Sequence, residues 1–284
     1  KVLNGTYAKQ AFEYPIKGEP VAATINGLSA NDYLMDNVFV IPADKIADYY
    51  GETVVVISTS KYKYTLNVTF ATLVITDAYQ LVNNNTEVAA SLMQLTGGLK
   101  DGVYTGYFVL GNNIDFESKA VSLKDYQNLS KGFSKGTFDG REYTISNLKI
   151  GSGSFFGGVL ETSTIKNVRF ENLRTERSAG ICGYFFGGVW QNVYISATLG
   201  DLTWGALLGN NPWRNFDLID CTFVIQAEET ALGQDKGVLF TGDPTYKNLI
   251  KLSNVTIITN HTKNPTNTVT GDTPGTTCES FTNV

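Results

Sequence analysis

The sequence predicts an all-β protein: a parallel, right-handed β-helix with a helical N-terminal cap, preceded by a small immunoglobulin-like β-sandwich. Three observations lead to this fold class. A short motif recurs along the second half of the chain, glycine-bounded apolar segments alternate with it, and the first 75 residues carry a different, strictly alternating pattern. A repeat that carries strand chemistry at this period is typical of a solenoid whose coils stack through parallel β-pairing.

The recurring motif places a polar turn residue directly before an alternating apolar pair. Its five copies are 20, 25, 28 and 34 residues apart. Asparagine tolerates the left-handed backbone conformation that a tight bend between strands needs, and stacked amides of consecutive coils can hydrogen-bond to one another. We therefore interpret these residues as a structural ladder rather than as ligand contacts. The turn residues are Asn147, Asn167, Asn192, Asp220 and Asn254.

A second element precedes each later copy of the motif. In it, glycines bracket two or three apolar residues, which predicts a short inward-facing strand with a sharp corner at each end. Each coil would then hold one such strand, a loop of variable length and the strand of the polar-turn motif. The growing spacings place the insertions in those loops, on one flank of the solenoid. The glycine-bounded segments are 154–158, 180–184, 205–209 and, less regularly, 237–242.

The two ends of the predicted solenoid have a different sequence. Apolar residues at helical spacing follow Thr86 and stop at Gly97, which predicts a helix that covers the open first coil at 104–116. Beyond Ile258 the apolar pattern stops. Residues 261–284 are rich in Thr, Asn and Pro and are expected to form a linker or tail. The predicted β-helix with its cap therefore covers residues 76–260.

Residues 1–75 show no repeat. In the segment 61–70, tyrosine and aliphatic residues fall on one face and mostly Lys and Thr on the other, which is the period of a half-buried antiparallel strand. Further strands are predicted at 53–58, 37–42 and 21–25, and a short polar link joins 53–58 to the alternating segment as a hairpin. Several short strands in this length indicate an immunoglobulin-like sandwich, although the Cys–Trp–Cys pattern of antibody domains is absent.

Composition and charge narrow the function classes. The chain has a net charge of −5 and a pI near 5.0, with Lys and Arg scattered, which disfavours nucleic acid as a partner. No run of about 18 apolar residues occurs, so no membrane span is expected. The abrupt, polar start at Lys1 suggests a mature form or a piece of a larger protein.

Neither a cofactor site nor a metal site is expected. The three cysteines lie far apart without a CxxC pair, and the sequence has no phosphate-binding loop and no spaced set of His and Cys ligands. Cys182 and Cys221 stand in repeat segments where other copies carry aliphatic residues, so we interpret them as small buried hydrophobic residues. A disulfide between Cys182 and Cys221 is the alternative interpretation.

The segment GTFDGREYTISNLKI (136–150), followed by SFFGG (154–158) and TIKNVRFEN (164–172), resembles the GLUG-motif surface proteins of gut and environmental bacteria. The resemblance covers roughly residues 75–260. It implies a parallel β-helix in a secreted, adhesin-like protein of the bacterial cell surface, commonly preceded by immunoglobulin-like modules and without catalytic residues. Glu142 replaces the second glycine of the family's lead-in, and Ala-Leu-Leu or Ile-Cys replaces Leu-Phe in later repeats, which loosens the motif but keeps it apolar.

Two other function classes stay open: a polysaccharide lyase or hydrolase, and a passive stalk in a larger wall protein. Parallel β-helices often host such enzymes, which need two carboxylates that converge on one groove. The turn chemistry of Asp139 and the motif position of Asp220 favour structural roles, and the only histidine, His261, follows the last repeat. The carboxylate candidates are Asp115, Asp139, Asp217 and Asp220.

Aromatic residues in two neighbouring coils are the best indication of a binding site. Aromatic rings on a rigid sheet suit stacking against sugar rings, and they form the centres of protein interfaces. The competing interpretation is that several of them point inward and fill the coil, with Trp204 and Trp213 as the expected exposed pair. The sequence thus predicts a non-catalytic module that binds a host or dietary glycan or a surface protein. The candidate residues are Trp204, Trp213, Trp190, Tyr184 and Tyr194.

Overall fold

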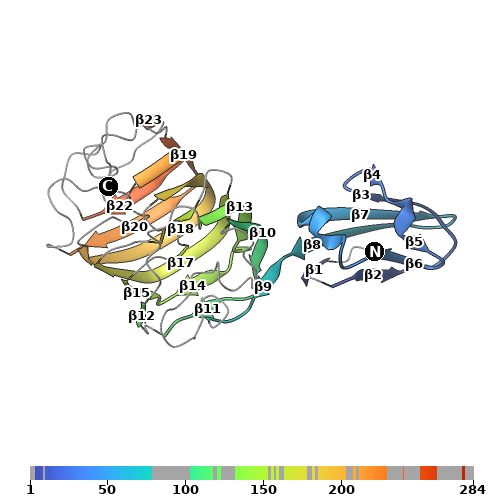
Figure 1. Ribbon diagram of the computed structural model, residues 1–284, viewed down its shortest axis with the longest axis horizontal. Coiled ribbons are helices and arrows are strands. Elements are labelled where there is room, and N and C mark those ends of the chain that lie inside the picture. The colour runs from blue at the N-terminus through green and yellow to red at the C-terminus, as the bar shows by residue number, and fades with distance from the viewer. Residues whose placement is uncertain are drawn as a thin grey trace. The chain divides into compact units, whose positions relative to one another are not determined.

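The computed structural model divides the chain into two compact units, and the described elements are strands with two short 3₁₀ helices (Figure 1). We call residues 1–74 with 106–109 the N-terminal unit, and residues 75–105 with 110–284 the parallel unit. The helix expected between 86 and 97 lies outside the described residues. The structure describes residues 4–8, 10–78, 103–117, 120–122, 132–152, 155–156, 158–159, 163–177, 181–182, 185–202, 207–208, 211–228, 239, 250–260 and 277–278.

The N-terminal unit contains two sheets whose buried faces share one core. A five-stranded sheet has the order β1-β8-β7-β3-β4, and a three-stranded sheet has the order β2-β6-β5. Strand β1 is parallel to β8, whereas the other neighbours are antiparallel. The elements are β1 (Asn4–Ala8), β2 (Phe12–Pro15), β3 (Pro20–Ile25), β4 (Leu28–Ser29), η1 (Asn31–Tyr33), β5 (Leu34–Met35), β6 (Val38–Ile41), η2 (Ile46–Tyr49), β7 (Gly51–Thr59) and β8 (Lys63–Ala71).

Alternation along the strands builds the core of the N-terminal unit. On β8, Leu66 and Val68 are buried while Asn67 between them is exposed, and β7 alternates in the same way. The hairpin predicted for this segment is present, because β7 and β8 pair along their length. Asn26 and Gly27 join β3 to β4 with φ of 49° and 83°, the left-handed pair that a two-residue hairpin turn requires.

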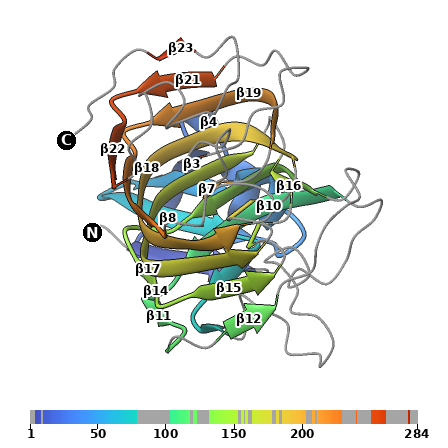
Figure 2. The same cartoon turned by 90° about the vertical axis from the view of Figure 1, so that its left-hand side faces the viewer.

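The parallel unit is built on one large sheet, in which the registers from β11 to β23 are parallel. Figure 2 shows β11, β14, β17 and β18 stacked one above another. This pairing confirms the predicted all-β class. The strands are β9 (Leu73–Ile75), β10 (Val103–Leu110), β11 (Ile114–Asp115), β12 (Ala120–Ser122), β13 (Gly132–Asp139), β14 (Thr144–Ser146), β15 (Lys149–Ser152), β16 (Gly158–Val159), β17 (Thr164–Arg177), β18 (Phe185–Leu202), β19 (Asn211–Ile219), β20 (Thr222–Ala227), β21 (Ile250–Ser253), β22 (Thr256–Thr259) and β23 (Thr277–Cys278).

Successive stretches of the chain form layers in this sheet, and equivalent residues of the layers form buried columns. Strands β13, β14 and β15 lie along β17, which lies along β18, and β18 is followed by β19 with β20 and then by β21 with β22. Each layer therefore buries apolar surface against the layers on both sides. One column is Phe138, Ile165, Trp190, Leu218 and Leu252, a second is Ile145, Phe170, Ile195, Phe223 and Ile257, and no member is more than 2% exposed.

Two details of the pairing add to the sequence analysis. Strand β23 pairs in parallel with Lys251 and Leu252, so Thr277 and Cys278, two residues of the segment expected to be a linker or tail, join the sheet. The 20-residue spacing from Asn147 to Asn167 is not a layer repeat, because Asn147 bonds to Asn172, which is 25 residues further on. The β17 layer carries asparagine at two bends, Asn167 and Asn172, so alignment by the motif alone matches different bends.

Candidate functional site

The polar turn residues of the motif share one backbone conformation. All five have φ between 51° and 55°, the left-handed region that asparagine and aspartate enter more readily than other non-glycine residues. Asn172, which the motif did not single out, has φ of 53° and belongs to the same class. The five residues are Asn147, Asn167, Asn192, Asp220 and Asn254.

Side-chain hydrogen bonds join four of these bends in two pairs along one corner of the parallel unit. Asn192 Nδ2 donates to Asn167 Oδ1 at 3.0 Å. Two layers further, Asn254 Nδ2 donates to Asp220 Oδ1 at 2.7 Å. Because the donor and acceptor belong to adjacent layers, each bond fixes the register of one layer on the next.

A second ladder follows the other bend. Asn172 Nδ2 donates to Asn147 Oδ1 at 2.6 Å, and Asn147 Nδ2 donates to Asp115 Oδ1 at 2.9 Å. The ladder ends at Ser196, whose hydroxyl oxygen accepts the backbone N–H of Asn172 at 3.1 Å. The register between β17 and β18 shifts at this point, since the β17 layer has one residue more at the bend.

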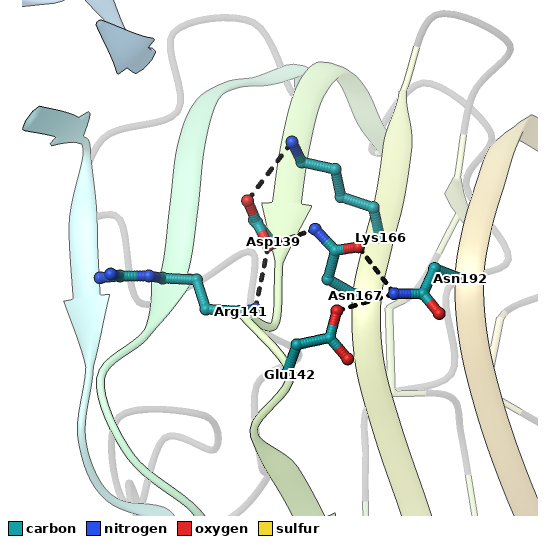
Figure 3. Close-up of polar contacts among 6 residues, drawn as sticks. All are labelled: Asp139, Arg141, Glu142, Lys166, Asn167 and Asn192. Atoms are coloured by element: carbon teal, nitrogen blue, oxygen red, sulfur yellow. Dashed lines mark hydrogen bonds and ion pairs between the residues drawn. The ribbon is translucent and has the colours of Figure 1, made fainter. Parts of the chain in front are cut away.

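Asp139 anchors the start of the first ladder in a polar cluster (Figure 3). Its carboxylate is 3% exposed and accepts hydrogen bonds from the Arg141 backbone N–H at 2.9 Å and from Asn167 Nδ2 at 3.2 Å. Lys166 Nζ lies 3.4 Å from its second oxygen. Figure 3 shows the Arg141 side chain pointing away from this cluster. The buried charge is thus compensated by an ion pair and by hydrogen bonds.

The two ladders together engage three of the four carboxylates considered for catalysis. Asp115, Asp139 and Asp220 each accept an asparagine amide. The hydrogen bond from Asn147, followed by the one from the Glu117 backbone N–H, lowers the pKa of Asp115. A general acid in glycoside cleavage needs the opposite shift. These contacts favour a structural use of the carboxylates, and Asp217 lies apart from them on β19, in register with Lys251.

An exposed cation and an aromatic ring lie side by side on the sheet. Arg169 of β17 and Tyr194 of β18 are partners in register, and the Arg169 guanidinium lies 4.1 Å from the centre of the Tyr194 ring. Arg169 also donates from Nε and from its terminal nitrogen to Glu171 Oε1, at 3.1 Å and 2.9 Å. Both Arg169 and Glu171 keep more than two fifths of their side-chain surface exposed, at 42% and 44%.

The neighbouring outward positions extend this surface, which we call the Arg169–Tyr194 face. Thr144 lies beside Arg169 on one side, and Thr222 and then Thr256 continue the row beyond Tyr194. Beyond the bend at Asn172, and so outside this row, a further ion pair joins Arg174 to Glu228 at 2.8 Å. Sequence reasoning missed Arg169, although it alternates with buried Val168 and Phe170, so strict period-two counting from Asn167 could have found it.

Two of the aromatic residues proposed from the sequence have different positions in the structure, one in the core and one on an outer face. Trp190 is fully buried, in edge contact with Phe156 and Phe216 at centroid distances of 6.1 Å and 6.2 Å, so it does not contact a ligand at the surface. The reason is its register, since it stacks between Ile165 and Leu218 in an inward column. Tyr194 faces outward and is half-buried.

The side chains of the other three aromatic candidates lie outside the described part of the chain. Trp204 and Tyr184 lie outside the described residues. Trp213 lies in β19, where the backbone of the strand is described but its side chain is not. Tyr194 is therefore the one proposed aromatic residue that the described part of the chain brings to an exposed face.

The two cysteines of the repeats are free and buried. Burial raises the pKa of Cys182 well above its usual range, and burial raises the pKa of Cys221 to about 11. The Cys221 thiol donates to the carbonyl oxygens of Ile219 and Trp190 at 3.2 Å and 3.4 Å. The structure therefore contains no Cys182–Cys221 disulfide, and both thiols are held in the unreactive protonated form.

Known proteins and common site types add no further assignment. No protein-family model matches the chain, and neither the curated proteins nor the solved structures include a significant match. Among the described residues, no group of three or more His, Cys, Asp and Glu side chains could hold a metal ion. The same residues include no helix long and apolar enough to cross a membrane.

Proposed function

We infer that this chain is a non-catalytic, adhesin-like interaction module of a bacterial cell-surface protein, and that its parallel unit binds a glycan or a surface protein. In this proposal the parallel unit is a parallel β-helix and the N-terminal unit an immunoglobulin-like sandwich. The layered parallel register and the left-handed asparagine bends support the first assignment. Two sheets that share one core support the second. The GLUG-like segments add the extracellular, cell-surface setting.

The contact between Arg169 and Tyr194 is the observation that carries the binding proposal. A phenol ring and a planar guanidinium in contact present apolar surface with hydrogen-bond donors at its edge. A sugar ring offers the complement, a face of C–H groups bordered by hydroxyls. The two bonds from Arg169 to Glu171 already hold the guanidinium in place, so less side-chain entropy is lost when a ligand binds.

The structural roles of the carboxylates make an interaction module a better interpretation than an enzyme. Asp115, Asp139 and Asp220 are engaged in the ladders, where each is a hydrogen-bond acceptor for a neighbouring layer. A passive stalk would use the same ladders and columns. The difference between stalk and adhesin therefore rests on whether the Arg169–Tyr194 face has a ligand.

Binding of the purified chain to a broad array of host and plant glycans tests the proposal. Tyr194→Ala should weaken a selective interaction about tenfold, because the ring contributes stacking of roughly 1 kcal/mol or more. Trp204→Ala/Trp213→Ala tests the pair expected from the sequence. Thr256→Ala, in the same outward row two layers away, is the matched control.

Three outcomes separate the alternatives. Selective binding that is lost in Tyr194→Ala and kept in Thr256→Ala supports the proposal. Binding lost only in the double tryptophan variant would move the site to that pair. Absence of binding to every glycan would overturn the glycan form of the proposal and favour the stalk.

A further inference from the structure

Three tyrosines form a column at one end of the N-terminal unit. The rings of Tyr14 on β2 and Tyr64 on β8 are in edge contact at 5.8 Å, and Tyr62 follows at 6.3 Å from Tyr64. Exposure rises along the column, from 8% at Tyr14, through a half-buried Tyr64, to 57% at Tyr62. The apolar face predicted for residues 61–70 thus continues past the core and reaches solvent.

The turn that presents Tyr62 is held by one side chain. Thr59 Oγ1 accepts the backbone N–H of Tyr62 at 2.8 Å and that of Lys61 at 3.2 Å, and it donates to the Tyr62 carbonyl oxygen at 3.1 Å. The Thr59 backbone N–H donates to the same carbonyl at 2.8 Å. The exposed ring therefore stands on a fixed backbone, which lowers the entropy lost when it stacks against a partner.

A second loop closes the same end of the unit. The Tyr64 hydroxyl donates to the Lys17 carbonyl oxygen at 3.0 Å, and the Ser60 backbone N–H donates to the Glu19 carbonyl oxygen at 3.2 Å. Residues 17–19 therefore lie beside the turn that carries Tyr62. This brings Lys17 to the same end of the unit as Lys61 and Lys63.

The charge at this end is positive although the chain as a whole carries −5. Lys17, Lys61 and Lys63 are exposed, and none of them forms an ion pair with a described residue. Arg169 and Arg174 of the parallel unit differ, because each has a carboxylate partner. Two exposed carboxylates lie at this end as well: Glu19, and Asp36 next to Asn37, whose carbonyl oxygen accepts the Ile16 backbone N–H at 2.6 Å, so the lysines exceed them by one.

We propose that the Tyr62 end of the N-terminal unit is a second binding site, and that its ligand is an acidic glycan whose sugar rings carry carboxylates. The Tyr62 ring stacks on the C–H face of a sugar, and the three ammonium groups pair with carboxylates of the polysaccharide. Charge complementarity favours this ligand over a neutral glycan, because ammonium groups at this end can form ion pairs with carboxylates that an uncharged polymer lacks. The site is independent of the Arg169–Tyr194 face.

Polygalacturonate and its methyl ester provide a probe pair with the same sugar and different charge. Isothermal titration of the whole chain should show tighter binding to polygalacturonate, with an affinity that falls as salt rises. Tyr62→Ala should weaken binding about tenfold, and Lys17→Gln/Lys61→Gln should weaken it and reduce the dependence on salt. Leu28→Ala, which removes another exposed apolar side chain of the unit, and Lys45→Gln, which removes another exposed lysine, are the controls and should leave affinity unchanged.

The result can separate this site from the one on the parallel unit. Loss of binding in Tyr62→Ala with full binding in Tyr194→Ala supports the second site even if the first proposal fails. Equal binding to polygalacturonate and its ester, no binding to polygalacturonate, or unchanged affinity in Tyr62→Ala would each overturn it. Because Tyr62 is exposed, unchanged thermal unfolding of Tyr62→Ala will show that the variant is folded.

Discussion

Both units place an asparagine in the left-handed conformation at a bend. The side-chain hydrogen bonds of this asparagine differ between the units in the part of the structure that they connect. Asn26, with φ of 49°, ends one hairpin: its backbone N–H donates to the Val54 carbonyl oxygen, and its Oδ1 accepts the Val54 N–H, both at 2.8 Å. Asn192, with φ of 52°, donates to Asn167 in the neighbouring layer and also to Glu142, at 3.0 Å and 2.7 Å. The first arrangement closes one strand edge, whereas the second couples layers.

The two hydrophobic cores also differ in whether their contacts join two sheets or successive layers. In the N-terminal unit, side chains of two sheets meet face to face, as in the edge contacts of Phe12 with Phe39 and Phe70 at 6.4 Å and 5.6 Å. In the parallel unit, buried side chains stack on their equivalents in adjacent layers, as Trp190 does between Ile165 and Leu218. A defect in the parallel unit should therefore disturb its neighbours through the layer interfaces, while a defect at a hairpin of the N-terminal unit should stay local.

A buried charge in a column should have the largest effect. Val193 is 1% exposed and lies between Val168 and the next layer, so Val193→Asp should lower the free energy of unfolding by about 4 kcal/mol, since nothing compensates the desolvation of its carboxylate. Urea unfolding followed by tryptophan fluorescence measures this, because all three tryptophans belong to the parallel unit. The control is Gln191→Asp, at an exposed position two residues earlier, and equal stability of the two variants would contradict the assigned register.

One glycine substitution in each unit allows their losses of stability to be compared directly. A Cβ on Gly140 would lie 2.5 Å from the Asn167 carbonyl oxygen and 2.7 Å from the Val168 Cα, so the next layer's backbone must move in Gly140→Ala. We expect this variant to lose about 3 kcal/mol. A Cβ on Gly27 would meet nothing within 4 Å, and Gly27→Ala should lose only about 1 kcal/mol, from strain at φ of 83°.

Urea unfolding of both glycine variants, followed by far-ultraviolet circular dichroism and by tryptophan fluorescence, checks the difference. Gly140→Ala should shift the tryptophan transition, and Gly27→Ala should leave it in place. If both variants lose the same stability, close layer contact is not what distinguishes the parallel unit.

Much of this architecture could be predicted because it follows from alternation and from turn chemistry. The period-two pattern of 61–70 predicted β8, and the asparagines marked the bends of the parallel unit because few residues tolerate positive φ. The assignment of layers failed at Asn147, since Asn167 and Asn172 stand at two bends only five residues apart and both fit the motif. Sequence alone does not say which bend of one layer lies on which bend of the next.

The surface was harder to predict than the core. The role of Trp190 as a ligand contact was wrong because its direction depends on the register of β18, and a large aromatic residue suits an inward column as well as an exposed face. A single arginine such as Arg169 does not by itself indicate a binding site in the sequence. Its importance comes from Tyr194, 25 residues later in the sequence, which the parallel register brings beside it.

The asparagine side chains should have smaller effects than Val193→Asp and Gly140→Ala, and they test whether side-chain hydrogen bonds couple the layers. Asn192→Gly keeps the left-handed backbone and removes two hydrogen bonds, so we expect a loss of about 1 kcal/mol. Asn192→Ala adds the strain of a Cβ at φ of 52°, for a total of about 2 kcal/mol. If the amide couples layers, Asn167→Gly/Asn192→Gly should lose less than the sum of the two single variants, because they share one bond. Asn26→Gly combined with Asn192→Gly should be additive, since their bonds share no residue, and strong coupling there would show that the two bends do not act independently.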